Sequence, residues 1–324
     1  MSTPTMKDVA ALAKVGVGTV SRVVNNKGAV KESTRRKVEN AIKELNYQPN
    51  EYARGLKTNQ TNTVALILPT IWHPFFSEFA YYVEAELENR GYKLLLCNSE
   101  DNYEKELEYI QMVQQNKVDG IIGITYSDLD KYVSANLPFV SIDRHFTEDV
   151  VYVTADNEAA GRLAVENLIE KGCTTLAYIG GFSKIPNETR NRQKYFSKEA
   201  DKRNVTNYSL EMPEPVHALK KEVMAFIREH PAIDGIFTIN DFMALDVIDI
   251  LAEMGKKVPE DIQVIGCDGI KLGMHRPLIV STIQQPVEEM AICSVQSLMK
   301  IIKQEPVESR IVLPVKYIDG KTTK

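Results

Sequence analysis

The stretch Val15–Asn25, VGVGTVSRVVN, decides how the N-terminal part of the chain is interpreted. Val20, Val23 and Val24 recur at helical spacing and predict the buried face of a short helix over residues 17–25. The remaining positions combine glycine, hydroxyl, amide and guanidinium groups on one side of that helix. The residues expected on this exposed face are Val17, Gly18, Ser21, Arg22 and Asn25.

A further helix is predicted on each side of this stretch. The first follows Thr5, and Asp8 three residues later completes the pattern of a capping box. The third is predicted to begin at Ser33, as its N-cap, and to run through TRRKVENAIKEL. Two short helices joined by a tight turn and supported by a third form a helix-turn-helix. The residues expected to face its core are Val9, Leu12, Ala13, Val38, Ala41, Ile42 and Leu45.

Charge is distributed unevenly along the 324 residues, although the net value is only −5. Residues 1–60 carry 11 Lys/Arg and 5 Asp/Glu, whereas residues 61–324 carry 28 and 39. A basic N-terminal part on an acidic chain indicates that this part alone meets a polyanion. A solvated pair of basic helices is an alternative that charge by itself leaves open.

Residues 63–324 alternate short apolar runs with amphipathic stretches. Several stretches, such as 157–171 and 241–254, have helical spacing. The runs that predict strands are TVALIL (63–68), YKLLLCN (92–98), VDGIIGIT (118–125), PFVSID (138–143), VVYVT (150–154), TLAYIGG (175–181), IDGIFTI (233–239), IQVIGCD (262–268) and VSTIQQ (280–285). This alternation predicts an α/β region with doubly wound parallel sheets that helices cover on both faces. In such folds a ligand binds between the carboxyl edges of the strands.

Several classes of protein find no support in the sequence. The four cysteines and five histidines show no disulfide or metal spacing, so we expect no metal and no cofactor. Phosphate-binding glycine loops and the G-x-S-x-G motif are absent, so we do not expect an enzyme. We see no secretory leader and no apolar run of about 20 residues, which predicts a cytoplasmic protein without a membrane partner.

The N-terminal region resembles the DNA-binding head of the LacI-type (lactose/galactose repressor) family through TVSRVVN, V.ESTR.KV..AI.ELNY.PN and ARGL. The resemblance implies that residues 17–25 lie in the major groove of DNA. Arg22 is then expected to contact guanine, Val17 to contact a thymine methyl, and Gly18 to permit close approach. A frayed first helical turn is the alternative explanation for Gly18. Phosphate contacts are expected from Thr5, Thr19, Ser21, Asn25, Ser33 and Asn50.

The segment PNEYARGLK, residues 49–57, is a short helix with a glycine and is marginal on its own. The resemblance implies that it folds on DNA, pairs with its dimer mate in the minor groove and inserts Leu56 at the central base step. An ordinary linker is the alternative. The expected domains are therefore a helix-turn-helix over 1–48, a hinge helix and linker over 49–62, and a regulatory and dimerisation domain over 63–324.

Residues 63–324 resemble the LacI-type regulatory core, which has the two-lobed fold of periplasmic sugar-binding proteins. The resemblance places lobe one at about 63–156 and 286–315, and lobe two at about 157–285 and 316–324. GCDGIKL, QQPVEEMA and the tail LPVKYIDGKTTK are most similar to ribose-operon repressors and next to sucrose-operon repressors. The tail shows no heptad repeat, so we expect a homodimer rather than a tetramer.

Polar and aromatic residues stand where the predicted strands meet loops, at positions that match ribose contacts in related ribose-binding proteins. Carboxylates accept from sugar hydroxyls, arginine and amides donate, and aromatic rings cover the C–H face. Helix capping, core packing or surface ion pairs are the alternatives, and at position 73 histidine replaces the usual asparagine. The expected effector-binding residues are His73, Phe75, Phe76, Asp143, Arg144, Arg192, Asn240, Asp268 and Gln285.

These interpretations predict a homodimeric repressor that binds a pseudo-palindromic double-stranded operator and leaves it when a sugar binds. A carbohydrate-utilisation operon is expected, with ribose as the first candidate. A sucrose or fructose operon repressor is the alternative. So is a catabolite-type regulator whose DNA binding is enhanced by a ligand or by a phosphocarrier corepressor.

Overall fold

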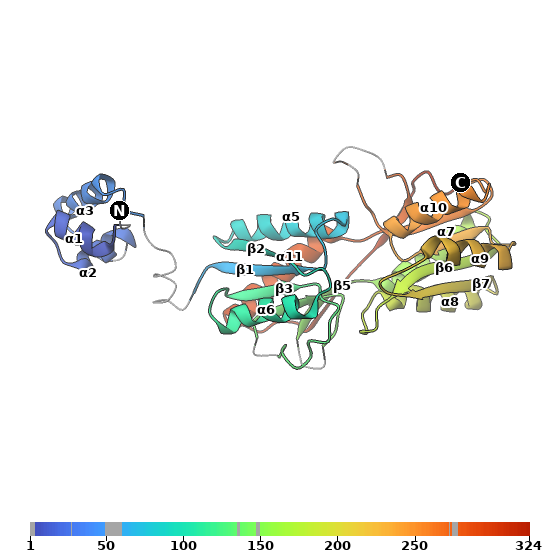
Figure 1. Cartoon of the computed structure of the whole chain (residues 1–324), viewed down its shortest axis with the longest axis horizontal. Helices are drawn as coiled ribbons and strands as arrows, with labels where there is room; N and C mark the ends of the chain where they lie inside the picture. Colours follow the sequence, from blue (N-terminus) through green and yellow to red (C-terminus); the bar gives the residue numbers. More distant parts are fainter. Residues whose placement is uncertain are drawn as a thin grey trace. The chain divides into compact units, whose positions relative to one another are not determined.

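The structure is a computed structural model that divides into two compact units, Met1–Thr61 and Asn62–Lys324 (Figure 1). Within the described part of the chain, no helix combines the length and apolarity needed to cross a lipid bilayer. The described residues are 4–26, 28–48, 60–134, 137–146, 150–271, 273 and 278–324.

The N-terminal unit consists of helices α1 (Met6–Ala13), α2 (Val17–Val24) and α3 (Glu32–Glu44). The Asp8 carboxylate accepts hydrogen bonds from both the backbone N–H and the hydroxyl of Thr5, each at 2.7 Å, and so fixes the start of α1. Apolar side chains from all three helices form one small core. Its buried members are Val9, Ala10, Ala13, Val20, Val23, Val38, Ala41 and Tyr47.

Two details of the predicted helix-turn-helix are wrong. Leu12, expected in the core, is 41% exposed, because α1 packs through Val9, Ala10 and Ala13. Helix α3 begins at Glu32 and not after Ser33, which lies in its first turn. The carbonyl of residue 31 already accepts from the N–H groups of residues 34 and 35. The N-cap is therefore residue 31, two residues before the predicted Ser33.

The first sheet of the second unit has the order β11-β5-β4-β3-β1-β2, and all its neighbours are parallel. Alternate residues of β1 face opposite layers: Val64, Leu66 and Leu68 pack with α5 and α11, and Ala65 and Ile67 pack with α6. The elements are β1 (Thr63–Leu68), α5 (Pro74–Glu88), β2 (Lys93–Asn98), α6 (Tyr103–Gln114), β3 (Gly120–Gly123), β4 (Phe139–Ile142), β5 (Val151–Ala155), α11 (Val287–Ile302) and β11 (Arg310–Leu313).

The second sheet has the order β12-β10-β9-β8-β6-β7, parallel except that β12 runs antiparallel to β10. Helices α9 and α10 cover one face, and α7 and α8 cover the other. The elements are α7 (Asn157–Glu170), β6 (Thr175–Phe182), α8 (Arg190–Lys202), β7 (Thr206–Pro213), α9 (Leu219–Glu229), β8 (Gly235–Thr238), α10 (Asp241–Glu253), β9 (Gln263–Asp268), β10 (Ser281–Gln284) and β12 (Lys316–Ile318).

The chain passes between the two sheets after β5, after β10 and between β11 and β12. This confirms the two-lobed α/β fold with doubly wound parallel sheets. The predicted strands did not include β7, β11 or β12. These strands lie at sheet edges and are only partly buried, so they lack the continuous apolar run that marks the inner strands.

One glycine sets the position of α8, the helix that carries Arg192. A Cβ at Gly161 of α7 would lie 2.4 Å from the Arg192 carbonyl oxygen and 2.6 Å from the Phe196 nitrogen. Only a residue without a side chain lets the two backbones approach this closely. The α7–α8 contact therefore holds Arg192 at a fixed depth beneath the carboxyl edge of the sheet.

Candidate DNA-binding and effector sites

The outward face of α2 carries the side chains expected to read bases. Val17 is 43% exposed, Gly18 and Arg22 are exposed, and a Cβ at Gly18 would meet nothing within 4 Å. This face is therefore open along its first turn, as a helix that enters a groove requires. The base contacts of Val17, Gly18 and Arg22 stay predictions.

The expected phosphate contacts are spread over the ends of the three helices. Thr5 precedes α1, Ser33 lies in the first turn of α3, and both are exposed at helix N-termini, which favour anions. Thr19, Ser21 and Asn25 are half-buried on α2 and at its end, and the Asn25 amide donates to the Ser21 carbonyl at 2.7 Å. Asn50 and Leu56 lie outside the described residues.

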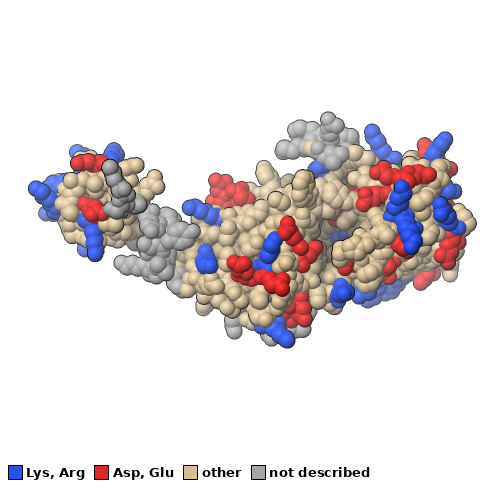
Figure 2. All heavy atoms as spheres, in the orientation of Figure 1, with Lys and Arg blue, Asp and Glu red and all other residues tan. Residues whose placement is uncertain are grey.

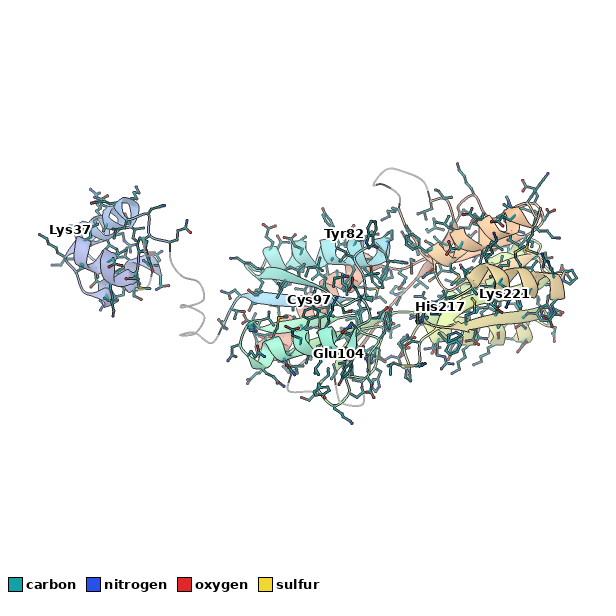
Figure 3. The ribbon with its side chains drawn as sticks, in the orientation of Figure 1. Lys37, Tyr82, Cys97, Glu104, His217 and Lys221 are labelled. Atoms are coloured by element: carbon teal, nitrogen blue, oxygen red, sulfur yellow. The ribbon has the colours of Figure 1, made fainter. Side chains whose placement is uncertain are left out.

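Figure 2 shows basic side chains at the upper, left and lower edges of the N-terminal unit, with acidic side chains among them. Lys37 of α3 projects outward (Figure 3). An exposed cationic surface of this kind neutralises phosphates and does not select a sequence.

Arg192 is the centre of the effector-site residues in the second unit. Its side chain is 4% exposed, its Nε donates to Asn157 Oδ1 at 2.7 Å, and its Nη1 donates to the Ile239 carbonyl. The Asp268 carboxylate lies 3.9 Å from the same Nη1. A guanidinium this deeply buried is stable only because these partners are in place.

Asp143 directly follows β4 of the first sheet, Asp268 is the last residue of β9 of the second, and both have positive φ, at 55° and 130°. Thr154 donates to Asp143 at 2.5 Å, and Gln285 donates to Asp268 at 2.7 Å. Burial raises the pKa of both carboxyl groups, that of Asp268 to about 8, against the opposing charge of Arg192. Residues that hold strained backbone at sheet edges are typical of ligand sites.

His73 closes the other side of this cluster. Its ring lies 5.2 Å from the ring of Phe76 and 4.5 Å from that of Phe242, and its Nε2 lies 3.9 Å from Asp268. Among the described residues, both ring nitrogens of His73 and Oε1 of Gln285 are buried polar atoms without a hydrogen-bond partner. Buried polar atoms are nearly always paired, so unpaired ones beside aromatic rings indicate a place for a ligand.

The structure brings together most of the expected effector residues but places three of them in other roles. Arg144 donates to the Ser127 carbonyl and stacks over the Phe146 ring, 4.1 Å away, rather than joining the Arg192 cluster. Phe75 is 6% exposed and belongs to the core of the first sheet. The side chain of Asn240 accepts a hydrogen bond from the N–H of residue 243 and caps α10. Helix capping is the alternative to sugar binding given above for such residues.

Sequence reasoning missed Asn157, Thr154 and Asp241. Asn157 bridges Arg192 and Thr154, and Asp241 accepts from the N–H groups of Gly269 and residue 270 and from the hydroxyl of residue 282. All three are buried, and each lies in or next to a strand end that feeds a helix. Their position at strand ends was the only feature of the sequence that could have identified these residues as part of the site. They hold other side chains and backbone groups in place, and no sequence motif marks that role.

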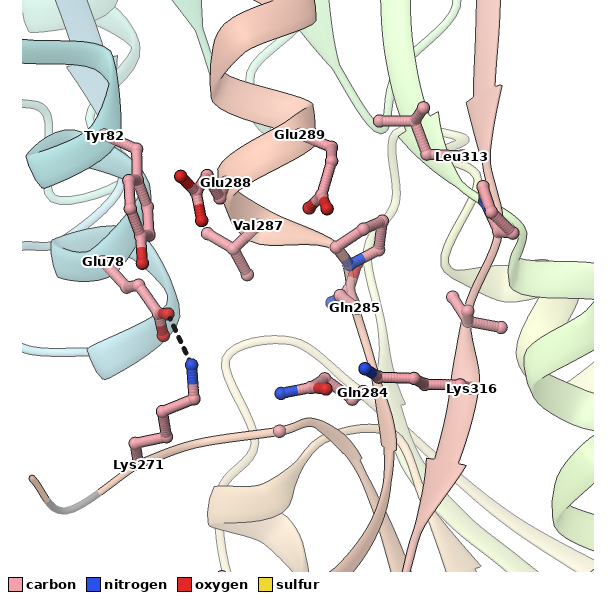
Figure 4. Close-up of a pocket in the computed structure, with 14 residues that line it drawn as sticks. Glu78, Tyr82, Lys271, Gln284, Gln285, Val287, Glu288, Glu289, Leu313 and Lys316 are labelled. Carbon is pink, nitrogen blue, oxygen red and sulfur yellow. Dashed lines mark hydrogen bonds and ion pairs between the residues drawn. The ribbon is translucent and has the colours of Figure 1, made fainter. Parts of the chain in front are cut away.

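A pocket of about 390 Å³ lies between the two lobes on the side of α5 and α11 (Figure 4). Lys271, from the segment after β9, reaches across it to Glu78 of α5 at 3.3 Å. Both side chains are partly exposed, so the pair adds little stability but does link the lobes. The pocket lining also includes Tyr82, Gln284, Glu288, Glu289 and Lys316.

His73→Asn is expected to remove part of the loss of stability on acidification. Burial and, to a smaller extent, the charge of Arg192 lower the pKa of His73 from 6.5 to about 4. Between these values the unfolded chain binds a proton that the folded protein does not, so the free energy of unfolding falls as the pH drops. The difference between pH 7 and pH 5 is about 2 kcal/mol. Urea unfolding at both pH values measures it, and an identical pH dependence in the variant would contradict this account.

The geometry defines a class: a helix-turn-helix unit joined to a two-lobed unit with a polar, partly unpaired cluster between its sheets. Models of known protein families match both parts of the chain. Residues 5–50 match "Bacterial regulatory proteins, lacI family", and residues 165–323 match a periplasmic binding protein-like domain. The chain belongs to the LacI family of DNA-binding transcriptional repressors.

Individual relatives agree over nearly the whole chain. A ribose operon repressor of Halalkalibacterium halodurans is 37% identical over 99% of this chain and 97% of its own. A sucrose operon repressor of Pediococcus pentosaceus is 35% identical over 98% of this chain and 99% of its own. A periplasmic binding protein/LacI transcriptional regulator from Alkaliphilus metalliredigens, solved with D-xylulofuranose, is 31% identical over 81% of this chain and 99% of its own, with a TM-score of 0.70.

Proposed function

We propose that this protein represses a carbohydrate-utilisation operon, with ribose as the first candidate effector, and that sugar binding releases it from operator DNA. The observation that carries the proposal is the buried cluster around Arg192, which offers charged partners and unpaired polar atoms beside two aromatic rings. Polyols are bound by this combination. The ribose operon repressor among the relatives supports the choice of sugar.

The operator is proposed to be a pseudo-palindrome bound by a homodimer, with one N-terminal unit on each half-site. Exposed apolar side chains on neighbouring elements of the first sheet support self-association: Tyr81 of α5 is 65% exposed, and Leu95 and Leu96 of β2 are 40% and 44% exposed. We further propose residues 1–48 as the DNA-binding domain, 49–62 as hinge helix and linker, and 63–324 as the regulatory domain. No catalysis, metal or cofactor is part of this function, and its place is the cytoplasm.

Control of DNA binding would follow from closure of the two lobes around the sugar. The Arg192 cluster draws residues from both sheets, so a ligand that completes it favours one lobe arrangement over another. Coupling between two sites is typically about 1–3 kcal/mol and is reciprocal, so operator must weaken sugar binding by the same factor.

A sucrose or fructose effector is the second candidate, favoured by the sucrose operon repressor that is 35% identical to this chain. One experiment tests the proposed function and separates the candidate sugars. A preferred duplex is first selected from random DNA, and its complex with the protein is then titrated with ribose, sucrose and fructose at several salt concentrations. We expect affinity for DNA to fall steeply with salt and one sugar to release the duplex. Tightening would indicate a corepressor instead, and no response to any of the three would refute the sugar proposal.

A further inference from the structure

The buried basic groups of the second unit are held by protein partners. Among the described residues the only buried basic side chains are Arg144 and Arg192. Arg144 donates to the Ser127 carbonyl and lies 3.5 Å from Asp130, away from the cluster. Arg192 is surrounded by protein partners and faces two carboxyl groups, of Asp143 and Asp268. Both buried guanidinium groups therefore already have protein partners.

The space between the lobes carries further negative charge. Asp101 follows β2 of the first sheet and Glu214 follows β7 of the second, and both are exposed. Burial and the charge of Asp101 raise the pKa of Glu214, and the charges of Asp143, Glu214 and Asp101 add to burial in raising the pKa of Tyr126. Carboxyl groups that follow strands of both sheets thus act on the same side chain, Tyr126.

The unpaired groups in the same region suit a neutral polyol. His73 is uncharged at neutral pH because its pKa is about 4, and its two nitrogens can donate one hydrogen bond and accept another. Gln285 Oε1 adds an acceptor, while Phe76 and Phe242 flank His73 with apolar surface. A sugar ring supplies hydroxyls that can pair with His73 and Gln285, and C–H faces that can pack on Phe76 and Phe242.

We propose that this site selects free, uncharged sugars and rejects their phosphate esters, an inference that rests on the proposed sugar-responsive function. A phosphate dianion would give up its water without gaining a buried cation that lacks protein partners, because the lysines that line the pocket between the lobes, Lys271 and Lys316, are exposed. Asp101 and Glu214 would add like charge to this region. Unpaired buried charge and like-charge neighbours are the means by which a site discriminates against a ligand.

The test is calorimetric titration of the full chain with matched pairs: ribose and ribose 5-phosphate, fructose and fructose 6-phosphate, glucose and glucose 6-phosphate. For the pair whose free sugar binds, we expect the phosphate ester to bind at least about 100-fold more weakly. Asp101→Asn with Glu214→Gln should reduce this ratio about tenfold. The matched control is Glu108→Gln with Glu229→Gln, two exposed carboxylates on α6 and α9, which should leave the ratio unchanged.

Equal or tighter binding of a phosphate ester would overturn the charge selection while leaving sugar binding intact. A ratio that falls as much in the Glu108/Glu229 variant would also overturn it, because the effect would then be one of net charge. Binding of no member of any pair would remove the proposed function, and this inference with it.

Discussion

Arg192→Met is expected to abolish effector binding and to lower the free energy of unfolding of the second unit by about 3–5 kcal/mol. The side chain is almost completely buried, and its removal leaves the side-chain oxygen Oδ1 of Asn157 and the backbone carbonyl of Ile239 without their donor. It also leaves Asp268 and Asp143 without the cation that offsets their burial. Urea unfolding and calorimetric titration with sugar measure the two effects.

Two controls separate the loss of the buried charge from a general effect of the substitution. Arg228→Met changes an exposed arginine on α9 of the same lobe and should alter stability by less than about 1 kcal/mol. Combining Arg192→Met with Asp268→Asn removes both members of the pair and should recover part of the stability, without restoring binding. An Arg192→Met protein as stable as the wild type would show that the cluster does not hold the lobe together.

Arg22→Ala is expected to weaken binding to the preferred duplex by about 1–3 kcal/mol per half-site, or roughly twice that for a dimer on two half-sites. Arg22 is exposed on the open face of α2, where a guanidinium can reach O6 and N7 of guanine. Because base contacts carry sequence preference, selection from random duplexes should recover a flatter consensus. Affinity for random DNA should change much less.

The matched control is Arg36→Ala, which removes an exposed arginine of α3 that pairs with Glu32 at 3.2 Å. If this arginine contacts DNA at all, it does so through phosphates, so its loss should weaken all duplexes alike and keep the consensus. An unchanged consensus in Arg22→Ala, or a changed one in Arg36→Ala, would refute the assignment of α2 as the reading helix.

Much of the fold was predictable because it depends on local patterns. The inner strands are continuous apolar runs, and the helices between them have one apolar stripe, so their order follows from the sequence. Edge strand β7 was missed because its residues are polar and only β6 pairs with it. The start of α3 was misplaced because Ser33 is a good cap residue that the backbone did not use.

The candidate site was predictable only in part, because strand ends show where a pocket forms but not which way each side chain turns. Asp143 and Arg144 are adjacent, yet Asp143 faces Arg192 and Arg144 turns toward Ser127 and Asp130. The backbone at Asp143 has a φ of 55° and is not extended, so strand alternation does not predict where the next side chain points, and the tertiary contacts decide it.

The sequence by itself determined the class of protein, the helix-turn-helix and the alternation that builds two parallel sheets, since these depend on spacing and composition. The tertiary structure alone decided which charges meet. Residues as distant along the chain as His73, Arg192 and Asp268 converge because parallel strands bring their carboxyl ends to one edge and Gly161 lets α8 approach closely. Burial then removed the charge of His73, an outcome that no local pattern contains.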